Sequence, residues 1–505
     1  MLQQKYRSSL TVQAFGLLIA KTLAFIFAFA LPVLLTRSLS QNEYGLFKQV
    51  FLIITTLTAL LPLGFGMSAY YYLPREQDLA RRGQVILNIL LFNLVMGIAA
   101  CLVLAFWPSL IGAVFRDSAM SSYAPLAGVV ILLWLFSSLL ETVAVANQEL
   151  RLATIFIVTG QLARTVLLLA AAILFDTVEA LIYAAMIHGV LQSAALIWYA
   201  STRFPGFWRA FDRSLTIKQI AYALPFGLAG LLYTIQTDLH NYFVSNRFSA
   251  ATFAVYSIGV AQLPFIGILR ESVSSVMLPR ISYLQEQGLT REIVLLLANA
   301  TRKLAVVILP VYAVLMVTGR EFLTVMFTST YAASWPIFAI NLTLLPLSLL
   351  DVDAVARAYE GHRFYLVKLQ IVLSVVNVFA LSYGISQFGL AGAISVVVGM
   401  NFVLRILLAA RFTKVIGAKL RDLVLLKDVG KVMLASVVAA LSCLLVRSFM
   451  TASGASPLVV LVVCFALFAI IYVVSILLLG VATSDERAQV RQGVVRLKLS
   501  FVKLL

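Results

Sequence analysis

Long apolar runs, separated by short polar connectors, recur along the whole chain. A helix that crosses a membrane needs about 20 consecutive, mostly apolar residues. We therefore predict about fourteen membrane-spanning helices, at residues 12–35, 45–66, 84–106, 124–147, 151–175, 178–200, 219–245, 252–274, 302–323, 334–357, 364–386, 389–411, 430–449 and 456–480. The fold class that follows is all-α integral membrane, because these runs leave little of the chain for anything else.

The connectors are too short to hold a soluble domain. The longest, at 201–218, 275–301 and 412–429, fall well below the roughly 50 residues of a small domain. Hydrophobic residues make up 62% of the 505 residues, and charged residues only 12%. A soluble protein of this composition would expose large apolar patches, so lipid must surround most of the surface.

The sequence carries no motif for common enzyme or metal chemistry. The patterns GxxxxGK[ST], HExxH and GxSxG are absent, which argues against nucleotide hydrolysis, zinc proteolysis and serine hydrolysis. Cys101, Cys443 and Cys464 lie inside apolar runs without a CxxC pair, so they are predicted to be small core residues. We predict that the chain is not an enzyme and binds no metal or organic cofactor.

The basic residues follow the pattern of membrane topology. The formal net charge is +17, but Lys and Arg lie in short connectors and not on a soluble, aromatic-rich surface, so we expect no nucleic-acid partner. Cytoplasmic connectors are enriched in Lys and Arg. With the N-terminus inside, the outer segments hold only a few basic residues, Arg37, Arg116, Arg247, Arg320 and Arg447. Both termini are therefore predicted to be cytoplasmic.

The C-terminal tail, 483–505, is a separate segment. Thr483-Ser484-Asp485-Glu486 forms a plausible helix start, because a hydroxyl side chain and acidic residues stabilise a helix N-terminus. Valines and basic residues then alternate, which favours an amphipathic helix on the inner leaflet. A disordered basic tail is the alternative.

Short self-matches predict an internal repeat at an offset of about 210 residues, the signature of two similar halves. The matched pairs are Leu39-Ser40 and Tyr44–Phe47 with Phe248-Ser249 and Phe253–Tyr256, Leu73-Pro74-Arg75 with Leu278-Pro279-Arg280, and Glu141 and Arg151 with Asp353 and Arg363. The domains predicted from them are an N-terminal six-helix lobe at 1–212, a second at 213–424, two added helices at 425–482 and the tail at 483–505.

Three segments carry a resemblance to a known family. They are Leu35–Phe47 (LTRSLSQNEYGLF), Gly64–Arg75 (GFGMSAYYYLPR) and Leu224–Tyr256. These segments resemble polysaccharide-transport flippases of the multidrug, oligosaccharidyl-lipid and polysaccharide exporter superfamily. Fourteen helices suit this family better than the twelve of the related multidrug exporters.

The resemblance implies a fold of two six-helix bundles around a central cavity. It also implies translocation of a polyprenyl-pyrophosphate-linked oligosaccharide from the cytoplasmic to the outer leaflet by alternating access, for cell-surface polysaccharide such as O-antigen or exopolysaccharide. The expected location is the bacterial cytoplasmic (inner) membrane, with a multi-pass topology. We expect a monomer whose partners are the lipid-linked substrate and, in the cell, polysaccharide polymerase and assembly proteins.

Several ionisable residues fall deep in the predicted helices. Each costs roughly 2.5–3.5 kcal/mol at a helix centre, so each needs a partner, a wet cavity or a function. A pyrophosphate group needs cationic donors to replace its water, and four cations are placed to supply them: Lys21, Arg164, Arg270 and Arg405. The alternatives are ion pairs with Asp238, Glu141 or Asp353, bonds to backbone carbonyls, or snorkelling to the inner surface.

The acidic residues have different predicted roles. Asp238 lies in the outer half of its helix, where a carboxylate can bind H⁺ or Na⁺ and couple an ion gradient to transport. An ion pair between Asp238 and Lys21 or Lys48 is the alternative. We predict that Glu141 pairs with Arg151, and Asp353 with Arg363, to pin the inner ends of two hairpins.

Two other functions remain open from the sequence. A membrane-embedded oligosaccharide polymerase or ligase would act on the same lipid carriers, but every outer connector here is short and nearly uncharged. A multidrug exporter of the same superfamily is the second alternative, and the additional helices and cationic spans argue against it.

Overall fold

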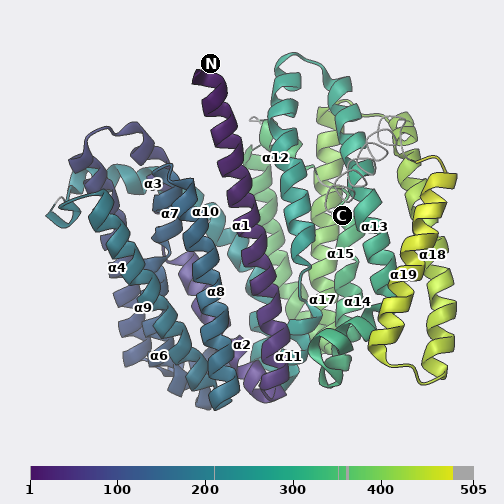
Figure 1. Cartoon of the computed structure of the whole chain (residues 1–505), viewed down its shortest axis with the longest axis horizontal. Coiled ribbons are helices and arrows are strands. Elements are labelled where there is room, and N and C mark those ends of the chain that lie inside the picture. Colours follow the sequence, from purple (N-terminus) through teal and green to yellow (C-terminus); the bar gives the residue numbers. More distant parts are fainter. Residues whose placement is uncertain (1, 210, 351, 360–362, 482–505) are drawn as a thin grey trace, which may run out of the picture. The chain divides into compact units, whose positions relative to one another are not determined.

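The computed structural model describes residues 2–209, 211–350, 352–359 and 363–481. Within these ranges the ordered elements are all helices, with no strand, so the predicted all-α fold class is confirmed. Figure 1 shows the helices and their labels. The chain forms two compact units: unit 1 holds Met1–Pro264 and Val367–Val397, and unit 2 holds Phe265–Leu366 and Val398–Leu505.

The helices of unit 1 come almost entirely from the first half of the chain. They are α1 (Leu2–Ser38), α2 (Gln41–Leu60), α3 (Met67–Tyr72), η1 (Leu73–Arg75), α4 (Leu79–Phe106), α5 (Ser109–Phe115), η2 (Ser118–Tyr123), α6 (Ala124–Ser137), α7 (Leu139–Ala146), α8 (Leu150–Phe175), α9 (Val178–Arg203), η3 (Phe207–Arg209), α10 (Arg213–Arg247) and α11 (Ala250–Gly259).

Most of the remaining elements belong to unit 2, and α17 runs through parts of both units. The elements are α12 (Pro264–Glu286), α13 (Thr290–Phe327), η4 (Ser329–Ser334), α14 (Trp335–Leu342), α15 (Leu344–Leu347), α16 (Asp353–Ala358), α17 (Arg363–Val415), η6 (Leu420–Leu426), α18 (Lys427–Ala452) and α19 (Pro457–Leu478).

The predicted count of fourteen spans is not confirmed. Ten described helical segments are long and apolar enough to cross a membrane. The predicted spans 45–66, 252–274 and 334–357 are not among them. Helix α2 ends at Leu60, and the structure divides each of the other two spans into shorter helices. The spans 364–386 and 389–411 count once, since α17 covers both and turns at Gly389, whose φ is 58°. Hydropathy detects an apolar run but not where its backbone bends.

The first repeat match corresponds to one local structure found twice. Ser40 and Ser249 are the N-caps of α2 and α11, with φ, ψ of −61°, 158° and −62°, 159°. The Ser40 side chain accepts a hydrogen bond from the Glu43 amide at 3.1 Å, and Ser249 accepts one from the Thr252 amide at 3.3 Å. A serine oxygen here satisfies an amide that the helix leaves free.

The second repeat match has different structures in its two copies. Leu73-Pro74-Arg75 forms the short helix η1, with Pro74 in its first turn. Leu278-Pro279-Arg280 lies within the long helix α12. The lobe boundaries at 212 and 424 remain a prediction. The two compact units are a separate division of the chain, with other limits.

The two matched helices, α2 and α11, pack against each other inside unit 1. At Gly45 the contact is so close that an added Cβ would lie 1.9 Å from the carbonyl oxygen of Ala250. Aromatic side chains flank it, and Tyr44, Phe253 and Tyr256 are almost fully buried. Glycine lets the backbones approach this closely, so Gly45 sets the spacing of the pair.

A buried polar network holds the start of α10. The Asn88 side-chain amide donates to Gln219 Oε1 at 3.0 Å and to the Asp212 carbonyl at 3.1 Å. The Gln219 amide donates to Ser68 Oγ and to the Val85 carbonyl, both at 3.2 Å. Buried amides need such partners. The network therefore ties α10 to α3 and α4.

Helix α10 then continues without interruption through Pro225. Gly227 packs on the turn after α2, where an added Cβ would lie 2.0 Å from the Leu63 carbonyl oxygen. Gly64 in that turn has a φ of +71°, a conformation that glycine adopts most readily.

In unit 2, helix α13 packs against α18 and α19 (Figure 1). The Arg447 guanidinium of α18 pairs with Glu321 of α13 at 2.9 Å, and the Glu321 side chain is 8% exposed. Cys443 donates its thiol to the Cys464 carbonyl at 3.2 Å, and both residues are fully buried. The three cysteines that were predicted as core residues are all free thiols. Two of them, Cys443 and Cys464, lie in the core.

The contact at Gly45 predicts a measurable stability change. In Gly45→Ala the new methyl group meets a backbone oxygen, and such overpacking costs about 1–3 kcal/mol. The measurement is thermal unfolding of the purified protein in detergent. Gly230→Ala in α10 is the matched control, because its Cβ would enter open space. An equal midpoint for Gly45→Ala and wild type would contradict the close packing of α2 and α11.

Candidate functional site

The residues predicted to bind substrate divide between the two units. Lys21 on α1, Arg164 on α8 and Asp238 on α10 belong to unit 1, whereas Arg270 on α12 and Arg405 on α17 belong to unit 2. Within the described part of the chain, Arg270 and Arg405 are half-buried and each has an interaction partner. The candidate site is therefore built from the residues of unit 1.

Lys21 is paired with an acidic residue. Its Nζ lies 3.7 Å from Oε1 of Glu141 on α7, and the two side chains are 55% and 45% exposed. The predicted pair between Glu141 and Arg151 is therefore wrong: Glu141 is engaged by α1, and Arg151 is exposed at the start of α8. The side chains of Asp353 and Arg363, predicted to form the equivalent pair, lie outside the described residues.

Arg164 lies in a cluster of cationic and aromatic side chains. Its guanidinium carbon is 4.4 Å from the ring centre of Trp134 on α6. Lys48 of α2 and His188 of α9 lie within electrostatic range of the same guanidinium. We call Lys48, Trp134, Arg164 and His188 the basic cluster.

The cluster has no acidic counterpart among the described residues. No described carboxylate pairs with Arg164 or with Lys48. The Arg164 Nε is buried without a hydrogen-bond partner in the described part. A cation over an indole ring gains about 0.5–2 kcal/mol, which offsets only part of the insertion cost of a central charge. The arrangement therefore suits an anion that is supplied from outside the protein.

Hydrogen bonds hold the other members of the cluster in place. Trp134 donates its indole N–H to the Ala185 carbonyl of α9 at 3.1 Å. His188 Nε2 lies 3.1 Å from the Gly160 carbonyl of α8, and the rings of Trp134 and His188 meet edge to face at 6.0 Å. Because α6, α8 and α9 are linked through these groups, the Arg164 side chain has a fixed platform.

Asp238 has a neutral partner. It accepts a hydrogen bond from the Thr56 hydroxyl of α2 at 3.0 Å, and it is half-buried. The alternative of an ion pair with Lys21 or Lys48 is not found in the described part of the chain, since Lys21 contacts Glu141. Asp238 therefore connects α10 to α2 without a cation.

His240, two residues further along α10, is buried and hydrogen-bonded. Its Nδ1 lies 2.9 Å from the Tyr256 hydroxyl of α11. This contact links α10 to α11.

From the sequence, Lys48 was predicted only as an alternative ion-pair partner for Asp238. Its place in the basic cluster was missed. The signal was available: Lys48 follows Tyr44 by one helical turn, and its ammonium lies 5.8 Å from that ring. Because Lys48 is a cation within an apolar run, it needs a partner, a wet cavity or a function, as Arg164 does. Its position relative to Arg164 depends on how the helices of unit 1 pack, which no local pattern reveals.

The chain matches one family model, described as polysaccharide biosynthesis protein, over residues 34–336. No curated protein sequence matches the chain.

Solved structures with a similar fold are membrane transporters. A lipid II flippase MurJ in an inward closed conformation shares 14% identity over 90% of this chain and 97% of its own, with a TM-score of 0.69. An inward-facing multidrug resistance MATE family transporter of the MOP superfamily shares 15% identity over 79% and 96%, with a TM-score of 0.59. A MOP superfamily transporter from Pyrococcus furiosus shares 17% identity over 81% and 96%, with a TM-score of 0.53. These likenesses confirm the expected fold.

The missing counter-charge predicts an unusual mutational response. Arg164→Met removes a half-buried, unpaired charge and should leave the thermal unfolding midpoint unchanged or higher, because deleting such a charge removes a desolvation cost. Arg447→Met is the contrasting variant, since it strands the buried carboxylate of Glu321 and should lower stability by roughly 3 kcal/mol. A loss of stability in Arg164→Met as large as in Arg447→Met would show that Arg164 has a structural partner.

Proposed function

Because this chain belongs to the polysaccharide biosynthesis protein family, we propose that it flips a polyprenyl-pyrophosphate-linked oligosaccharide from the cytoplasmic to the outer leaflet. The chain is a multi-pass membrane protein with the fold of flippases and transporters, and the prediction that it is not an enzyme agrees with these neighbours. Alternating access between two conformations is the proposed mode of transport.

The observation that carries the proposal is the unpaired basic cluster. A pyrophosphate must exchange its water for donors that are already in place, and guanidinium and ammonium groups make the strongest such hydrogen bonds. Arg164 and Lys48 lie within electrostatic range of each other, and no described carboxylate neutralises them. An arriving diphosphate would relieve their mutual repulsion, so binding gains energy that a neutral ligand would not.

Lys21 fits the same role in a different way. Its contact with Glu141 is long, at 3.7 Å, and half-exposed, and an exposed pair of this kind contributes only about 0–1 kcal/mol. An incoming phosphate can therefore displace the carboxylate at little cost. Arg270 and Arg405 remain proposed ligands for the substrate from unit 2.

Asp238 is the proposed coupling residue. A carboxylate that accepts one hydroxyl hydrogen bond has capacity left for a proton or a sodium ion. Either ion would alter the bond to Thr56 and hence the link between α10 and α2. Neutralising the Asp238 carboxylate would lower the cost of placing this side chain in the membrane interior.

The remaining expectations follow from this function. We propose the bacterial inner membrane as the location, with both termini cytoplasmic, and O-antigen or exopolysaccharide as the product to which the transported unit contributes. A monomer that works beside a polymerase and assembly proteins is sufficient for this task. The predicted helix at 483–505 lies outside the described residues.

A multidrug exporter is the second candidate, favoured by the fold shared with the MATE transporter. Organic cations would be repelled by the basic cluster, whereas lipid-linked anions would be attracted. The same vesicles can test both substrates, since an exporter would move a cationic dye and a flippase would move the lipid-linked sugar.

Charge reversal tests the basic cluster directly. In liposomes that contain the purified protein and a lipid-linked oligosaccharide, Lys48→Glu and Arg164→Glu should abolish flipping, because the anion would meet like charge. Lys21→Glu and Arg270→Glu should act in the same direction. Flipping is measured by the access of an impermeant lectin to the sugar. Arg320→Glu, at an exposed position of α13, is the control, and wild-type flipping in the first two variants would contradict the proposal.

Coupling is tested at Asp238. Asp238→Asn keeps the hydrogen bond from Thr56 but removes the negative charge, so flipping should lose its dependence on a proton or sodium gradient across the liposome. Thr56→Val, which keeps the carboxylate, should retain that dependence. Unchanged gradient dependence in Asp238→Asn would leave the residue a purely structural link.

A further inference from the structure

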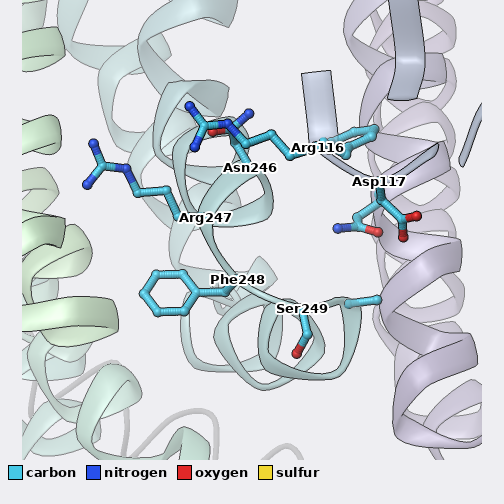
Figure 2. A pocket seen from close by; sticks show the side chains of 9 residues that line it. Arg116, Asp117, Asn246, Arg247, Phe248 and Ser249 are labelled. Carbon is cyan, nitrogen blue, oxygen red and sulfur yellow. The ribbon is translucent and has the colours of Figure 1, made fainter. Parts of the chain in front are cut away.

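A pocket of about 630 Å³ lies within unit 1, apart from the basic cluster. It is formed by the connection from α5 to η2, the turn from α10 to α11, and one residue of α2. Figure 2 shows the side chains that line it. Both chain segments that form it were predicted to lie on the outer side of the membrane, because they fall in connectors poor in basic residues.

Two arginines give the pocket its charge. Arg116 ends α5 in a left-handed conformation, with φ 52°, and Arg247 is the last residue of α10. Arg247 donates one hydrogen bond, to the Ser382 hydroxyl at 3.2 Å, and among the described residues no salt bridge engages either guanidinium. Their remaining N–H groups are available to a ligand, and guanidinium groups match phosphate oxygens well.

The acidic residue of the pocket is already engaged. Asp117 Oδ1 accepts the Ala119 amide at 3.0 Å and so caps η2. In Figure 2 the guanidinium groups of Arg116 and Arg247 lie toward one side of the pocket, and the Asp117 carboxylate lies toward the other. The lining side chains keep a net positive charge, and the start of α11 adds the partial positive charge of a helix N-terminus.

Gln49 of α2 adds a second, independent requirement. It lines the pocket and is only 2% exposed. Its amide nitrogen lies 3.5 Å from the Ser245 carbonyl, while its Oε1 is buried without a hydrogen-bond partner in the described part. An unsatisfied buried acceptor costs about 1–3 kcal/mol. A ligand that supplies a hydroxyl donor beside its phosphate would satisfy this oxygen, whereas a bare phosphate dianion would not.

We infer that this pocket binds a glycosyl phosphate group, with Arg116 and Arg247 on the phosphate and Gln49 Oε1 accepting from a sugar hydroxyl. Under the proposed function, the pocket receives the head group on the outer side after translocation. This direction of transport rests on the proposed function. The chemistry of recognition depends only on the residues that line the pocket.

Helix α2 connects this pocket to the basic cluster. Lys48 belongs to the cluster and Gln49 to the pocket, and consecutive helical residues point about 100° apart around the axis. The two sites thus lie on different sides of one helix.

The test measures binding of two soluble probes, glucose 1-phosphate and inorganic phosphate, to the purified full-length protein in lipid nanodiscs by calorimetry. Wild type should bind both, and glucose 1-phosphate more tightly. Arg116→Ala and Arg247→Ala should each weaken both probes by about tenfold, the usual effect of one charge-assisted hydrogen bond. Gln49→Leu should weaken glucose 1-phosphate alone, toward the affinity for phosphate.

Control variants separate this pocket from other cations. Arg320→Ala, another arginine in a predicted outer segment, should bind both probes as wild type does. Thermal unfolding of each variant shows whether it is folded, and Arg247→Lys should recover part of the lost affinity. Equal binding by wild type, Arg116→Ala and Arg247→Ala, or no saturable binding at all, would overturn the inference. Unchanged glucose 1-phosphate affinity in Gln49→Leu would overturn the hydroxyl contact.

The outcome can be told apart from failure of the proposed function. If wild type binds the probes in the predicted pattern but moves no lipid-linked sugar in liposomes, the pocket stands and the flippase proposal fails. If wild type flips the lipid while the arginine variants bind both probes normally, the pocket is wrong and the flippase proposal stands.

Discussion

Positive charge without a described counter-charge is the constraint on which the proposed function depends. Lys48 and Arg164 lie within electrostatic range of each other in a helical bundle with an apolar exterior, and each such charge is expensive to place there. Trp134 beneath the guanidinium supplies only part of the compensation. A protein retains such an arrangement where the missing charge arrives with a ligand, as the diphosphate of a lipid-linked sugar would.

Unit 2 shows how the same chain treats a cation that has only a structural role. There Arg447 meets the buried carboxylate of Glu321 at 2.9 Å, and Arg302 donates to the Val481 carbonyl at 3.1 Å. Both cations are matched by acceptors and tie α13 to α18 and to the end of α19. The contrast with Arg164 indicates that the unpaired charges of unit 1 do not result from a general shortage of acceptors.

Helix α2 is the element that brings the functional groups together. Over fewer than five turns it carries Gly45 against α11, Lys48 in the basic cluster, Gln49 in the outer pocket and Thr56 on Asp238. Any shift of α2 would therefore act on all of these contacts at once. The close approach at Gly45 matters because it fixes the helix that positions them.

The sequence by itself determined the membrane environment, the positions of most of the membrane-spanning helices and the candidate cations, since these depend on local composition and spacing. Only the tertiary structure decided which apolar runs are broken, that Glu141 pairs with Lys21, and that Lys48 joins Arg164. It also brought Arg116, Arg247 and Gln49 to one pocket. The physical reason is that charge pairing depends on how each helix is rotated against its neighbours, and a periodic pattern of apolar residues on all faces does not encode that rotation.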